Sequence, residues 1–478
     1  MVVAPVISRA FNAADQAAFG VLSGDTNPLH ADPVAARRTQ AGDWVVHGAH
    51  ALLWALDAIF ADNPGAASPR SLRVRFERFI YLGEDAVVEV VERGATTLRA
   101  EVRAAGVRAI GLTLGFGPRR EPQPQPAEPG VIDIGPQARP PLEFALEDLA
   151  ALRGTVGFAR PALETAVAFP RVGAALGPAR AAAIATLSRL SGMVCPGLHS
   201  ITSSYALEFV DGDEDATGIR FATARVAARF RLATISVWGA GIEGTMESFA
   251  RRPPVAQAAY ADMRRTVAAD AFAGSDVLVF GGSRGLGEVA AKLAAAGGAA
   301  TTLTYAVGRE DAESVAADIE AGGGVCRVAR FDARAPVEPQ LGDLAPTHVY
   351  YCATPQIFRQ RPVAFSPEVL ADFTRVYIES FFDVCRLLGA RRPLAAFFPS
   401  TAFVENPPRD ALEYAMAKAA AETLCAGLER AIPDVRVQTR RLPRVSTDQT
   451  ASVRPSDGAD AVEVMLPIVL ALQAVRAG

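Results

Sequence analysis

The sequence predicts two fold classes on one chain. These are an α+β region of antiparallel strands around buried helices and, after it, an α/β region with a doubly wound parallel sheet. Residues 86–92, 98–103 and 109–115 alternate apolar and polar side chains, the period of half-buried antiparallel strands. Farther along, the apolar run 276–280 leads into a glycine-rich turn and a helical pattern, and strand and helix patterns alternate from there. That alternation is typical of a parallel sheet.

Composition limits the class of protein. The 478 residues are half hydrophobic and 21% charged, which predicts a folded chain of about three domains. A net charge of −4 argues against a general nucleic-acid binder. Five cysteines without CxxC spacing predict a reducing compartment and no zinc site. With no apolar run of membrane-spanning length, we expect a cytoplasmic protein that does not enter a membrane.

Ser23-Gly-Asp-Thr-Asn-Pro-Leu-His-Ala-Asp-Pro33 concentrates chemically active side chains in eleven residues. Asp25 and His30 flank Asn27-Pro28, and the turn favoured by that dipeptide can direct both side chains to one point. An Asn-Pro turn with an incidental acid and histidine is the plain structural alternative.

His47-Gly48 precedes an apolar-periodic run over 52–60 that predicts a buried helix. A glycine at the start of a helix lets a ligand oxygen approach free backbone N–H groups. Proton transfer beside a thioester carbonyl needs such donors together with a positioned acid and base. We therefore expect Asp25 and His30 to share the acid/base work and the Gly48 N–H to polarise the carbonyl, with Asn27 and His47 contacting substrate.

The two stretches, Ser23–Pro33 and Val45–His50, resemble the signature of MaoC-type (R)-specific enoyl-thioester hydratases and dehydratases, which have the hotdog fold. Residues 71–83 resemble the strand that follows the central helix of that family. The resemblance covers about residues 8–117 and implies a first hotdog domain at 1–117.

A stretch rich in Pro, Gln and Glu follows at 118–141 and predicts a semi-rigid linker, with Arg119 and Arg120 as solvated surface. Residues 142–255 are predicted to repeat the first domain in degenerate form, which gives a double hotdog and resembles the double-hotdog hydratases. Strand-like runs lie at 217–222, 226–232 and 245–249.

In this second domain, Ser191–Ser200 takes the position of His47-Gly48 ahead of a predicted central helix, and an Asp-x4-His string is missing before Cys195-Pro196-Gly197. His199 is either a ligand contact or structural. One half would then carry the chemistry while the other completes the binding tunnel.

Residues 256–273 are predicted to be a helical connector, and residues 274–478 a Rossmann-type domain. Glycines in the loop after the first strand allow a sharp turn and let a pyrophosphate rest on helix N–H groups. The loop supplies six cofactor-binding candidates: Gly281, Ser283, Arg284, Gly285, Leu286 and Gly287.

Tyr414-Ala-Met-Ala-Lys418 places an ammonium one helical turn from a phenol, where its charge would lower the phenol pKa. With the glycine loop, this string resembles the short-chain dehydrogenases/reductases over about residues 274–450. The resemblance implies that Tyr414 exchanges a proton with the substrate oxygen and that Lys418 also holds the nicotinamide ribose. It also implies a carbonyl-positioning serine, for which we nominate Ser400 first and Thr401 second.

The charges near the loop favour NADPH over NAD. The second strand ends in Thr304–Arg309 without an acid for the ribose hydroxyls, and Arg284 and Arg309 could both face a 2′-phosphate. Asp332 matches a family position at the adenine, and Ala353 one that lines the cofactor.

Four positions depart from the reductase pattern: Phe280, Tyr351-Cys352-Ala353-Thr354, Tyr377 and Arg444. These departures bring the proton relay of the reductase family into question. An inactive reductase-like domain is therefore an alternative to an active one.

Together the two resemblances imply a bifunctional enzyme. It would reduce a 3-oxoacyl thioester with NADPH and dehydrate the 3-hydroxyacyl product to the trans-2-enoyl thioester, on acyl-CoA or acyl-carrier-protein substrates, without a metal. One alternative is the reverse pair, enoyl-CoA hydratase and (R)-3-hydroxyacyl-CoA dehydrogenase in acyl breakdown. Another is an active dehydratase with a non-catalytic nucleotide- or partner-binding Rossmann domain. A homodimer is expected because reductase folds commonly pair through helices beside the sheet.

Overall fold

The computed structural model describes residues 7–62, 68–124, 130–358, 365–408, 410–448 and 458–475. The chain forms two compact units that change over between Pro253 and Pro254. Within the described residues, no helix is both long and apolar enough to cross a membrane.

Eleven strands and seven α-helices are described in the N-terminal unit. The strands are β1 (Ile7–Ala10), β2 (Pro69–Phe76), β3 (Asp85–Arg93), β4 (Thr97–Ala104), β5 (Val107–Phe116), β6 (Ile132–Ile134), β7 (Arg153–Gly157), β8 (Ser200–Phe209), β9 (Gly218–Ala227), β10 (Leu232–Gly239) and β11 (Ile242–Ala250). The α-helices are α1 (Ala13–Ser23), α2 (Pro28–Ala31), α3 (Pro33–Arg37), α4 (Gly48–Ala61), α5 (Ala162–Ala168), α6 (Pro170–Leu176) and α7 (Pro178–Arg189). Short helical turns are η1 (Asp148–Ala151), the π-helix η2 (Leu190–Val194) and η3 (Ala228–Phe230).

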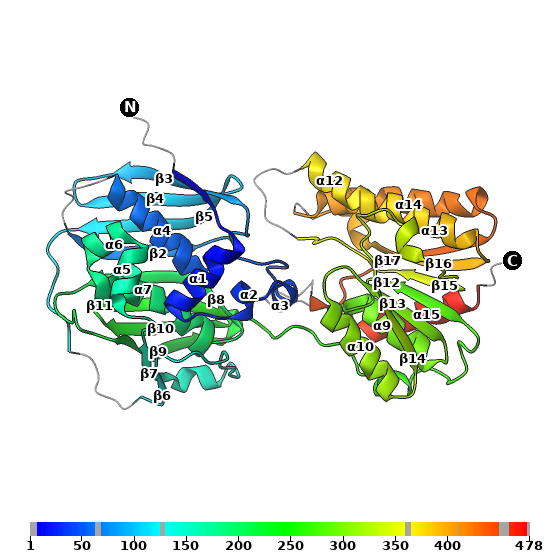
Figure 1. The fold of residues 1–478 in the computed structure, drawn as a ribbon, viewed down its shortest axis with the longest axis horizontal. Coiled ribbons are helices and arrows are strands. Elements are labelled where there is room, and N and C mark those ends of the chain that lie inside the picture. The colour runs from blue at the N-terminus through cyan, green and yellow to red at the C-terminus, as the bar shows by residue number, and fades with distance from the viewer. Residues whose placement is uncertain are drawn as a thin grey trace. The chain divides into compact units, whose positions relative to one another are not determined.

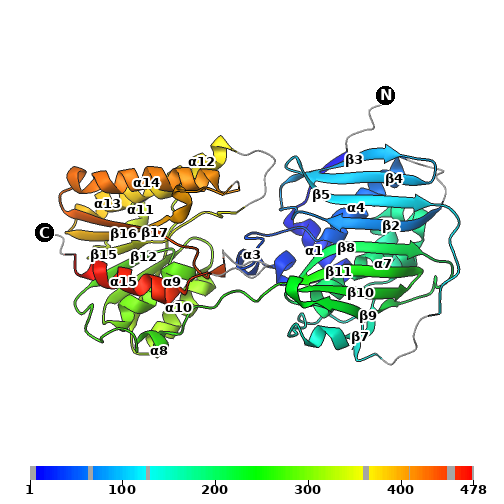
Figure 2. The same ribbon diagram turned by 180° about the vertical axis from the view of Figure 1, so that it is seen from behind.

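All eleven strands join one sheet in the order β1-β3-β4-β5-β2-β8-β11-β10-β9-β7-β6 (Figures 1 and 2). Counted outward from the middle of the sheet, the first half has the order β2-β5-β4-β3-β1 and the second half the order β8-β11-β10-β9-β7. Both halves therefore have the same strand topology. The halves meet where β2 pairs antiparallel with β8, with Leu72 opposite Leu207 and Val74 opposite Tyr205.

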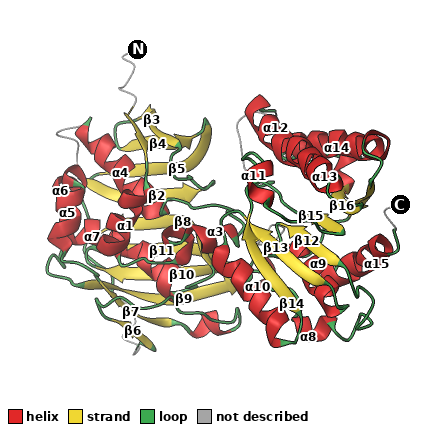
Figure 3. Cartoon of the chain, turned by 45° about the vertical axis from the view of Figure 1, so that its right-hand side comes forward, coloured by secondary structure: helices red, strands yellow, loops and turns green. Residues whose placement is uncertain are grey.

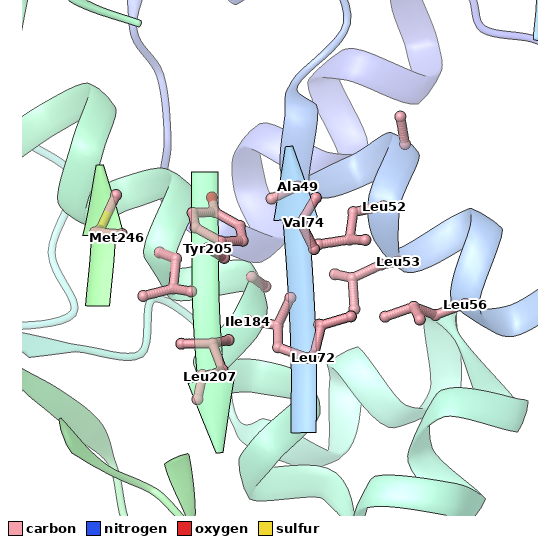
Figure 4. Close-up of a cluster of buried hydrophobic side chains, with 14 of the residues drawn as sticks. Ala49, Leu52, Leu53, Leu56, Leu72, Val74, Ile184, Tyr205, Leu207 and Met246 are labelled. Atoms are coloured by element: carbon pink, nitrogen blue, oxygen red, sulfur yellow. The ribbon is translucent and has the colours of Figure 1, made fainter. Parts of the chain in front are cut away.

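Two long helices share a single core with this sheet. α4 and α7 contact each other, and Leu52, Leu53 and Ile184 are fully buried between them and the strands (Figure 4). Every residue of α7 from Ala179 to Arg189 is buried. Its many alanines favour a helix and let neighbouring backbones approach closely. The second half therefore buries its helix as completely as the first.

The prediction for this second helix was wrong in position. The helix α7 precedes residues 191–200, and β8 already begins at Ser200, so His199 lies ahead of a strand and not at a helix start. The predicted strand 226–232 covers the end of β9, the turn η3 and the first residue of β10. A helix buried on all sides has no apolar stripe, which is why periodicity did not reveal it.

The predicted linker at 118–141 is also partly ordered. Ile132–Ile134 forms β6 and pairs with β7, while Arg120 donates to Glu243 at 2.7 Å. Arg119 donates to the Ala175 carbonyl oxygen at 3.1 Å, so this pair of arginines is bound and not merely solvated. Residues 125–129 lie outside the described residues.

The C-terminal unit has six described strands and eight α-helices. The strands are β12 (Asp276–Phe280), β13 (Ala300–Tyr305), β14 (Val325–Arg330), β15 (His348–Tyr351), β16 (Leu394–Thr401) and β17 (Val435–Leu442). The helices are α8 (Tyr260–Met263), α9 (Gly285–Ala296), α10 (Arg309–Ala321), α11 (Glu338–Leu341), α12 (Pro367–Thr374), α13 (Phe381–Gly389), α14 (Leu412–Ala431) and α15 (Ala461–Gln473), with the π-helix η4 (Arg375–Ser380) and the turn η5 (Ala402–Val404).

The predicted doubly wound sheet is confirmed. All described pairings are parallel, in the order β14-β13-β12-β15-β16-β17 (Figure 1). Helices lie on both sides of this sheet (Figure 3). One core packs α9, α10 and α15 on one face, and a second packs α13 and α14 on the other. The strand order reverses between β12 and β15, and in such sheets ligands bind beyond the carboxyl ends of the strands at that point.

The predicted helical connector at 256–273 is mostly irregular, since only Tyr260–Met263 is α-helical. Two aromatic side chains tie it down instead. Tyr260 donates to the Ala295 carbonyl oxygen at 3.2 Å, and Phe272 is buried against Gly297, where a Cβ would lie 2.1 Å from the ring. The segment is part of the core of the C-terminal unit.

Candidate active sites

Asp25 follows α1 directly. That helix ends at Gly24, whose φ of 75° gives a left-handed turn, and α2 begins at Pro28 with Asn27 as its cap. The Asn27 side-chain oxygen accepts from the Leu29 N–H at 3.0 Å. The cap therefore fixes the short loop that carries Asp25, as the Asn-Pro pair predicted.

The carboxylate of Asp25 is 2% exposed, and both its oxygens are bound. One accepts from the Ser188 hydroxyl at 2.6 Å, and the other from the Asn27 backbone N–H at 3.1 Å. Burial raises the pKa of Asp25, while the charge of His30 and the Ser188 hydrogen bond act against that rise. A raised pKa brings the carboxyl closer to the pH range in which a general acid or base works best.

His30 lies beside Asp25, as expected. One of its ring nitrogens, one Asp25 carboxylate oxygen and one His47 ring nitrogen all lie within 4.8 Å of one another. The Nδ1–H of His30 donates to the Val45 carbonyl oxygen at 3.0 Å, which leaves Nε2 as its basic nitrogen. Burial lowers the pKa of His30, so the neutral imidazole is favoured. The arrangement of Asp25 and His30 therefore suits an acid/base pair.

His47 has a different place from the one predicted. Its Nε2 contacts the Asp25 backbone oxygen at 3.0 Å, and its Nδ1 contacts the Gln16 side-chain oxygen at 2.7 Å. Its ring stacks on His30 with centroids 4.1 Å apart, and burial holds its pKa well below the usual range. Both ring nitrogens face oxygen atoms of the protein, so His47 supports the Asp25 backbone; a contact with substrate stays a prediction.

Gly48 is the first residue of α4, and that helix start has no side-chain cap. A Cβ on Gly48 would lie 3.0 Å from Phe76. Asp25, His30 and Gly48 line a cavity of about 70 Å³, together with hydroxyl groups from the other half of the sheet: Ser188, Ser191, Ser200, Thr202 and Tyr205. This volume has room for a few water molecules. These hydroxyl groups could not be predicted from the sequence, because they lie far from Asp25 along the chain; the Ser188 contact spans 163 residues.

Asn27 contacts this second half as well. Its Nδ2 donates to the Gly192 carbonyl oxygen at 2.7 Å. Asn27 is thus committed to the protein, whereas the sequence predicted a substrate contact.

In the C-terminal unit, the glycine loop has the predicted shape. Gly281 and Gly285 have φ values of 72° and 57°, which side chains rarely adopt. A Cβ on Gly287 would lie 2.2 Å from the Gly281 carbonyl oxygen. The start of α9 has no side-chain cap, so its first N–H groups, around Ser283–Leu286, suit an anion.

The charged residues near this loop are less available than predicted. Arg284 is paired with Asp448 at 2.6 Å, an acid that the sequence analysis did not consider. Arg309 is largely exposed and pairs with Glu313 at 3.2 Å. Arg309 is thus the more exposed of the two arginines proposed for the 2′-phosphate.

Asp332 and Ala353 lie just after the carboxyl ends of β14 and β15, two strands that β13 and β12 separate in the sheet. Asp332 follows β14 and accepts from the Arg334 N–H at 2.9 Å. Ala353 follows β15 so closely that a Cβ on Gly281 would lie 2.9 Å from its nitrogen. Both positions are compatible with a cofactor at the carboxyl edge of the sheet.

Tyr414 and Lys418 lie one turn apart on α14, but their electrostatics differ from the expectation. Burial raises the pKa of Tyr414 to about 12 and lowers that of Lys418 to about 7. The Lys418 ammonium donates to the Pro399 carbonyl oxygen at 2.6 Å and lies 3.9 Å from the Tyr377 ring centroid. The predicted lowering of the phenol pKa is therefore absent from the described site.

Of the two nominated hydroxyl groups, Thr401 is the one beside Tyr414. Its hydrogen bond to the phenol acts to lower the Tyr414 pKa. Ser400 instead donates to Glu422 at 2.5 Å, and Glu422 also binds Arg441. The order of preference, with Ser400 first, is reversed by this geometry.

The departures from the reductase pattern have structural partners. Phe280 packs on Phe331, and the Tyr351 hydroxyl donates to the Val376 carbonyl oxygen at 2.8 Å. Tyr377 is fully buried in η4, and its hydroxyl lies 2.5 Å from that of Thr354. The Arg444 carbonyl oxygen accepts from the Ala459 N–H at 2.9 Å. These residues build the core and the loops near the strand ends.

Comparison with solved structures gives similarity over part of the chain. A 3-oxoacyl (acyl-carrier-protein) reductase from Agrobacterium tumefaciens with NADP bound is 24% identical over 42% of this chain and 88% of its own, with a TM-score of 0.38. A short-chain dehydrogenase from Burkholderia cenocepacia in complex with NADP is 21% identical over 43% and 95%, also with a TM-score of 0.38. At these scores the assignment of the parallel sheet rests on its own strand order.

No curated protein sequence matches the chain, whereas a family model does. Residues 2–111 match the family described as MaoC like domain. This region contains Asp25, His30 and Gly48. Its strands belong to the first half of the eleven-stranded sheet, and it includes the central helix α4. The N-terminal part of the chain is thus a MaoC-like domain.

Proposed function

We propose that the chain is a bifunctional acyl-thioester enzyme. Its N-terminal unit, a pair of hotdog domains, dehydrates a 3-hydroxyacyl thioester to the trans-2-enoyl thioester or runs the reverse hydration. Its C-terminal unit, a short-chain reductase, makes the 3-hydroxyacyl thioester from the 3-oxoacyl thioester with NADPH. The substrates are thioesters of CoA or of an acyl carrier protein, and the setting is fatty-acid-like or polyketide-like metabolism.

One observation carries the first activity, namely the buried pair of Asp25 and His30 next to the start of α4. In dehydration, the His30 Nε2 takes the C2 proton while Asp25 delivers a proton to the departing hydroxyl; hydration reverses both transfers. The Gly48 N–H stabilises the enolate oxygen, aided by the dipole of α4.

The second activity is supported by the glycine loop and by Tyr414. The loop has the close packing between strand and helix that glycines allow in dinucleotide-binding folds, because a Cβ at Gly281 or Gly287 would collide with backbone. NADPH, when bound, supplies the hydride. Tyr414, with its pKa raised to about 12, stays protonated near neutral pH and can donate to the carbonyl oxygen.

In the reductase site, Thr401 positions the carbonyl and Lys418 holds the ribose, with Asp332 and Ala353 near the adenine half. Arg309 contributes the preference for the 2′-phosphate, since Arg284 is bound to Asp448.

The first test uses purified full-length protein and crotonyl-CoA. Wild type should hydrate it to the (R)-3-hydroxyacyl product, and Asp25→Asn should lose at least about a thousandfold in rate, because the acid/base group is gone. Asp25→Asn should still oxidise NADPH with a 3-oxoacyl thioester. Joint loss of both activities in a folded variant contradicts the assignment of one chemistry to each unit.

A second candidate function is favoured by the environments of Lys418 and Arg284, two cationic side chains that were predicted to contact the cofactor. Lys418 donates to a backbone oxygen and has a pKa lowered to about 7, and Arg284 is paired with Asp448. In this reading the C-terminal unit binds a nucleotide or a partner without turnover. NADPH binding in calorimetry, together with no oxidation on short, long and carrier-linked 3-oxoacyl thioesters, would favour it over the reductase.

A further inference from the structure

We propose that Ser188 is a positioning residue for Asp25, so that the second half of the N-terminal unit takes part in the acid/base chemistry. This inference rests on the proposed hydratase function. The MaoC-like match ends at residue 111, and Ser188 lies on α7, which belongs to the other half of the sheet.

The direct contact is short and buried. The Ser188 hydroxyl donates to one Asp25 carboxylate oxygen at 2.6 Å, and Ser188 itself is only 6% exposed. The other carboxylate oxygen accepts from the Asn27 N–H. A carboxylate held at both oxygens keeps one orientation toward His30, whereas loss of the hydroxyl leaves it free to turn about its last bond.

The same segment also holds the backbone that carries Asp25. The π-helix η2 follows α7 at once, and its Gly192 carbonyl oxygen accepts from the Asn27 side chain. A Cβ at position 192 would lie 2.5 Å from an Asp25 carboxylate oxygen. π-Helical turns of this kind are frequent at functional sites. The second half is thus shaped to receive Asp25.

A second group of hydrogen-bonded hydroxyl groups lies at the cavity wall. The Thr202 hydroxyl donates to Ser191 at 3.0 Å, and Ser191 and Ser248 lie 2.9 Å apart. Tyr205, seen beside Val74 in Figure 4, closes the same cavity. A wall of hydroxyl groups fits the water, or the 3-hydroxyl group, that the acid/base pair adds or removes.

The hydrogen bond has a predictable effect on charge. A donor to a carboxylate favours the ionised form, so the Ser188 contact lowers the pKa of Asp25 against the rise caused by burial. Hydration needs the ionised carboxylate as the base. Loss of the hydroxyl should therefore move the acidic limb of the rate profile to higher pH.

The experiment compares Ser188→Ala with two variants in the full-length protein, using crotonyl-CoA hydration across pH. Ser188→Ala should lower kcat about tenfold or more, raise the acidic midpoint by about one pH unit, and change KM less than about threefold. Ser188→Thr keeps a hydroxyl group, so its kcat and its acidic midpoint should both lie close to the wild-type values. Thr186→Val is the matched control, because Thr186 is as buried on the same helix but donates to the Ala182 carbonyl oxygen. It should behave as wild type.

A second readout does not depend on turnover. Infrared difference titration, wild type minus Asp25→Asn, follows the protonated carboxyl band, which should persist to higher pH in Ser188→Ala. An unchanged midpoint and kcat in Ser188→Ala, or equal losses in Thr186→Val, would overturn the role of Ser188 while leaving the hydratase intact. If wild type hydrates no enoyl thioester, the proposed function fails, and the infrared titration alone then decides whether Ser188 sets the state of Asp25.

Discussion

His50 is a buried imidazole within the first turn of α4 that takes no part in the proposed chemistry. Its ring stacks on Phe19 with centroids 4.7 Å apart and touches Phe11 edge-on, and burial lowers its pKa to about 3. Among the described residues its Nδ1 has no hydrogen-bond partner. Such a histidine is neutral when the protein is folded and becomes protonated when it unfolds in acid.

The sign of the pH dependence follows from this difference. The unfolded imidazole binds a proton below its ordinary pKa of 6.5, while the folded one does not until about 3. The contribution of His50 to the free energy of unfolding is therefore fully present above pH 6.5. As the pH falls from 6.5 to about 3, this contribution decreases by up to about 1.4 kcal/mol per pH unit. His50→Phe should flatten that slope in denaturant unfolding of the N-terminal unit. His348→Phe, in the other unit, is the control, and a slope unchanged by His50→Phe would contradict the account.

Thr401 and Ser400 offer a second test at this scale. Thr401 hydrogen bonds to Tyr414, whereas Ser400 is bound to Glu422. Thr401→Ala should lower kcat for NADPH-dependent reduction of a 3-oxoacyl thioester about a hundredfold, because the carbonyl loses its positioning donor. Ser400→Ala should stay within about threefold of wild type. The opposite ranking would restore the original preference for Ser400.

Among the elements, the β12–loop–α9 unit depends on glycines for its packing. A Cβ at Gly287 would lie 2.2 Å from the Gly281 carbonyl oxygen, so Gly287→Ala must displace the loop or the helix. We expect it to abolish NADPH binding in calorimetry and to lower the unfolding temperature of the C-terminal unit. Crotonyl-CoA hydration should be unchanged.

Gly427→Ala is its matched control, because Gly427 lies inside α14 with open space where a Cβ would stand. Alanine there should stabilise the C-terminal unit by about 0.5–1 kcal/mol, since it favours the helix. NADPH binding that survives Gly287→Ala would contradict the placement of the cofactor at this loop.

Elements with a local signal could be predicted from the sequence. β3, β4 and β5 showed a period of two, and β12, α9, β13 and α10 alternated around a recognisable glycine loop. α7 escaped because it is buried on every side, and β6 because its short apolar run lies in a Pro-rich segment. The alternation of apolar and polar residues reveals an element only when one of its faces is buried and another is exposed. α7 has almost no exposed face, and β6 is too short to show a pattern.

The residues of the candidate sites likewise fall into those that local sequence could predict and those that it could not. Asp25, Asn27 and His30 lie within one turn, so their proximity follows from local geometry. Ser188, Gly192 and Asp448 approach from distant parts of the chain, and only the folded sheet brings them to the site. The direction of Ser400 and the burial of Lys418 depend equally on packing between elements.

For the whole molecule, the two compact units imply separable chemistries. Each has its own sheet and its own hydrophobic core, and each contains all the residues of its proposed site. A mixture of Asp25→Asn and Tyr414→Phe full-length proteins should therefore convert a 3-oxoacyl thioester to the enoyl thioester, although neither variant does so alone. Failure of the mixture, with both single activities present, would mean that the intermediate is not released between the units.

The most direct test of the two-step account gives wild-type protein NADPH and acetoacetyl-CoA and follows both nicotinamide absorbance and the acyl products. We predict oxidation of NADPH well above that of NADH, with formation of 3-hydroxybutyryl-CoA and then crotonyl-CoA. Hydration of crotonyl-CoA without any nicotinamide oxidation, also on longer and carrier-linked 3-oxoacyl thioesters, would contradict the reductase and leave a hydratase that carries a silent nucleotide-binding unit.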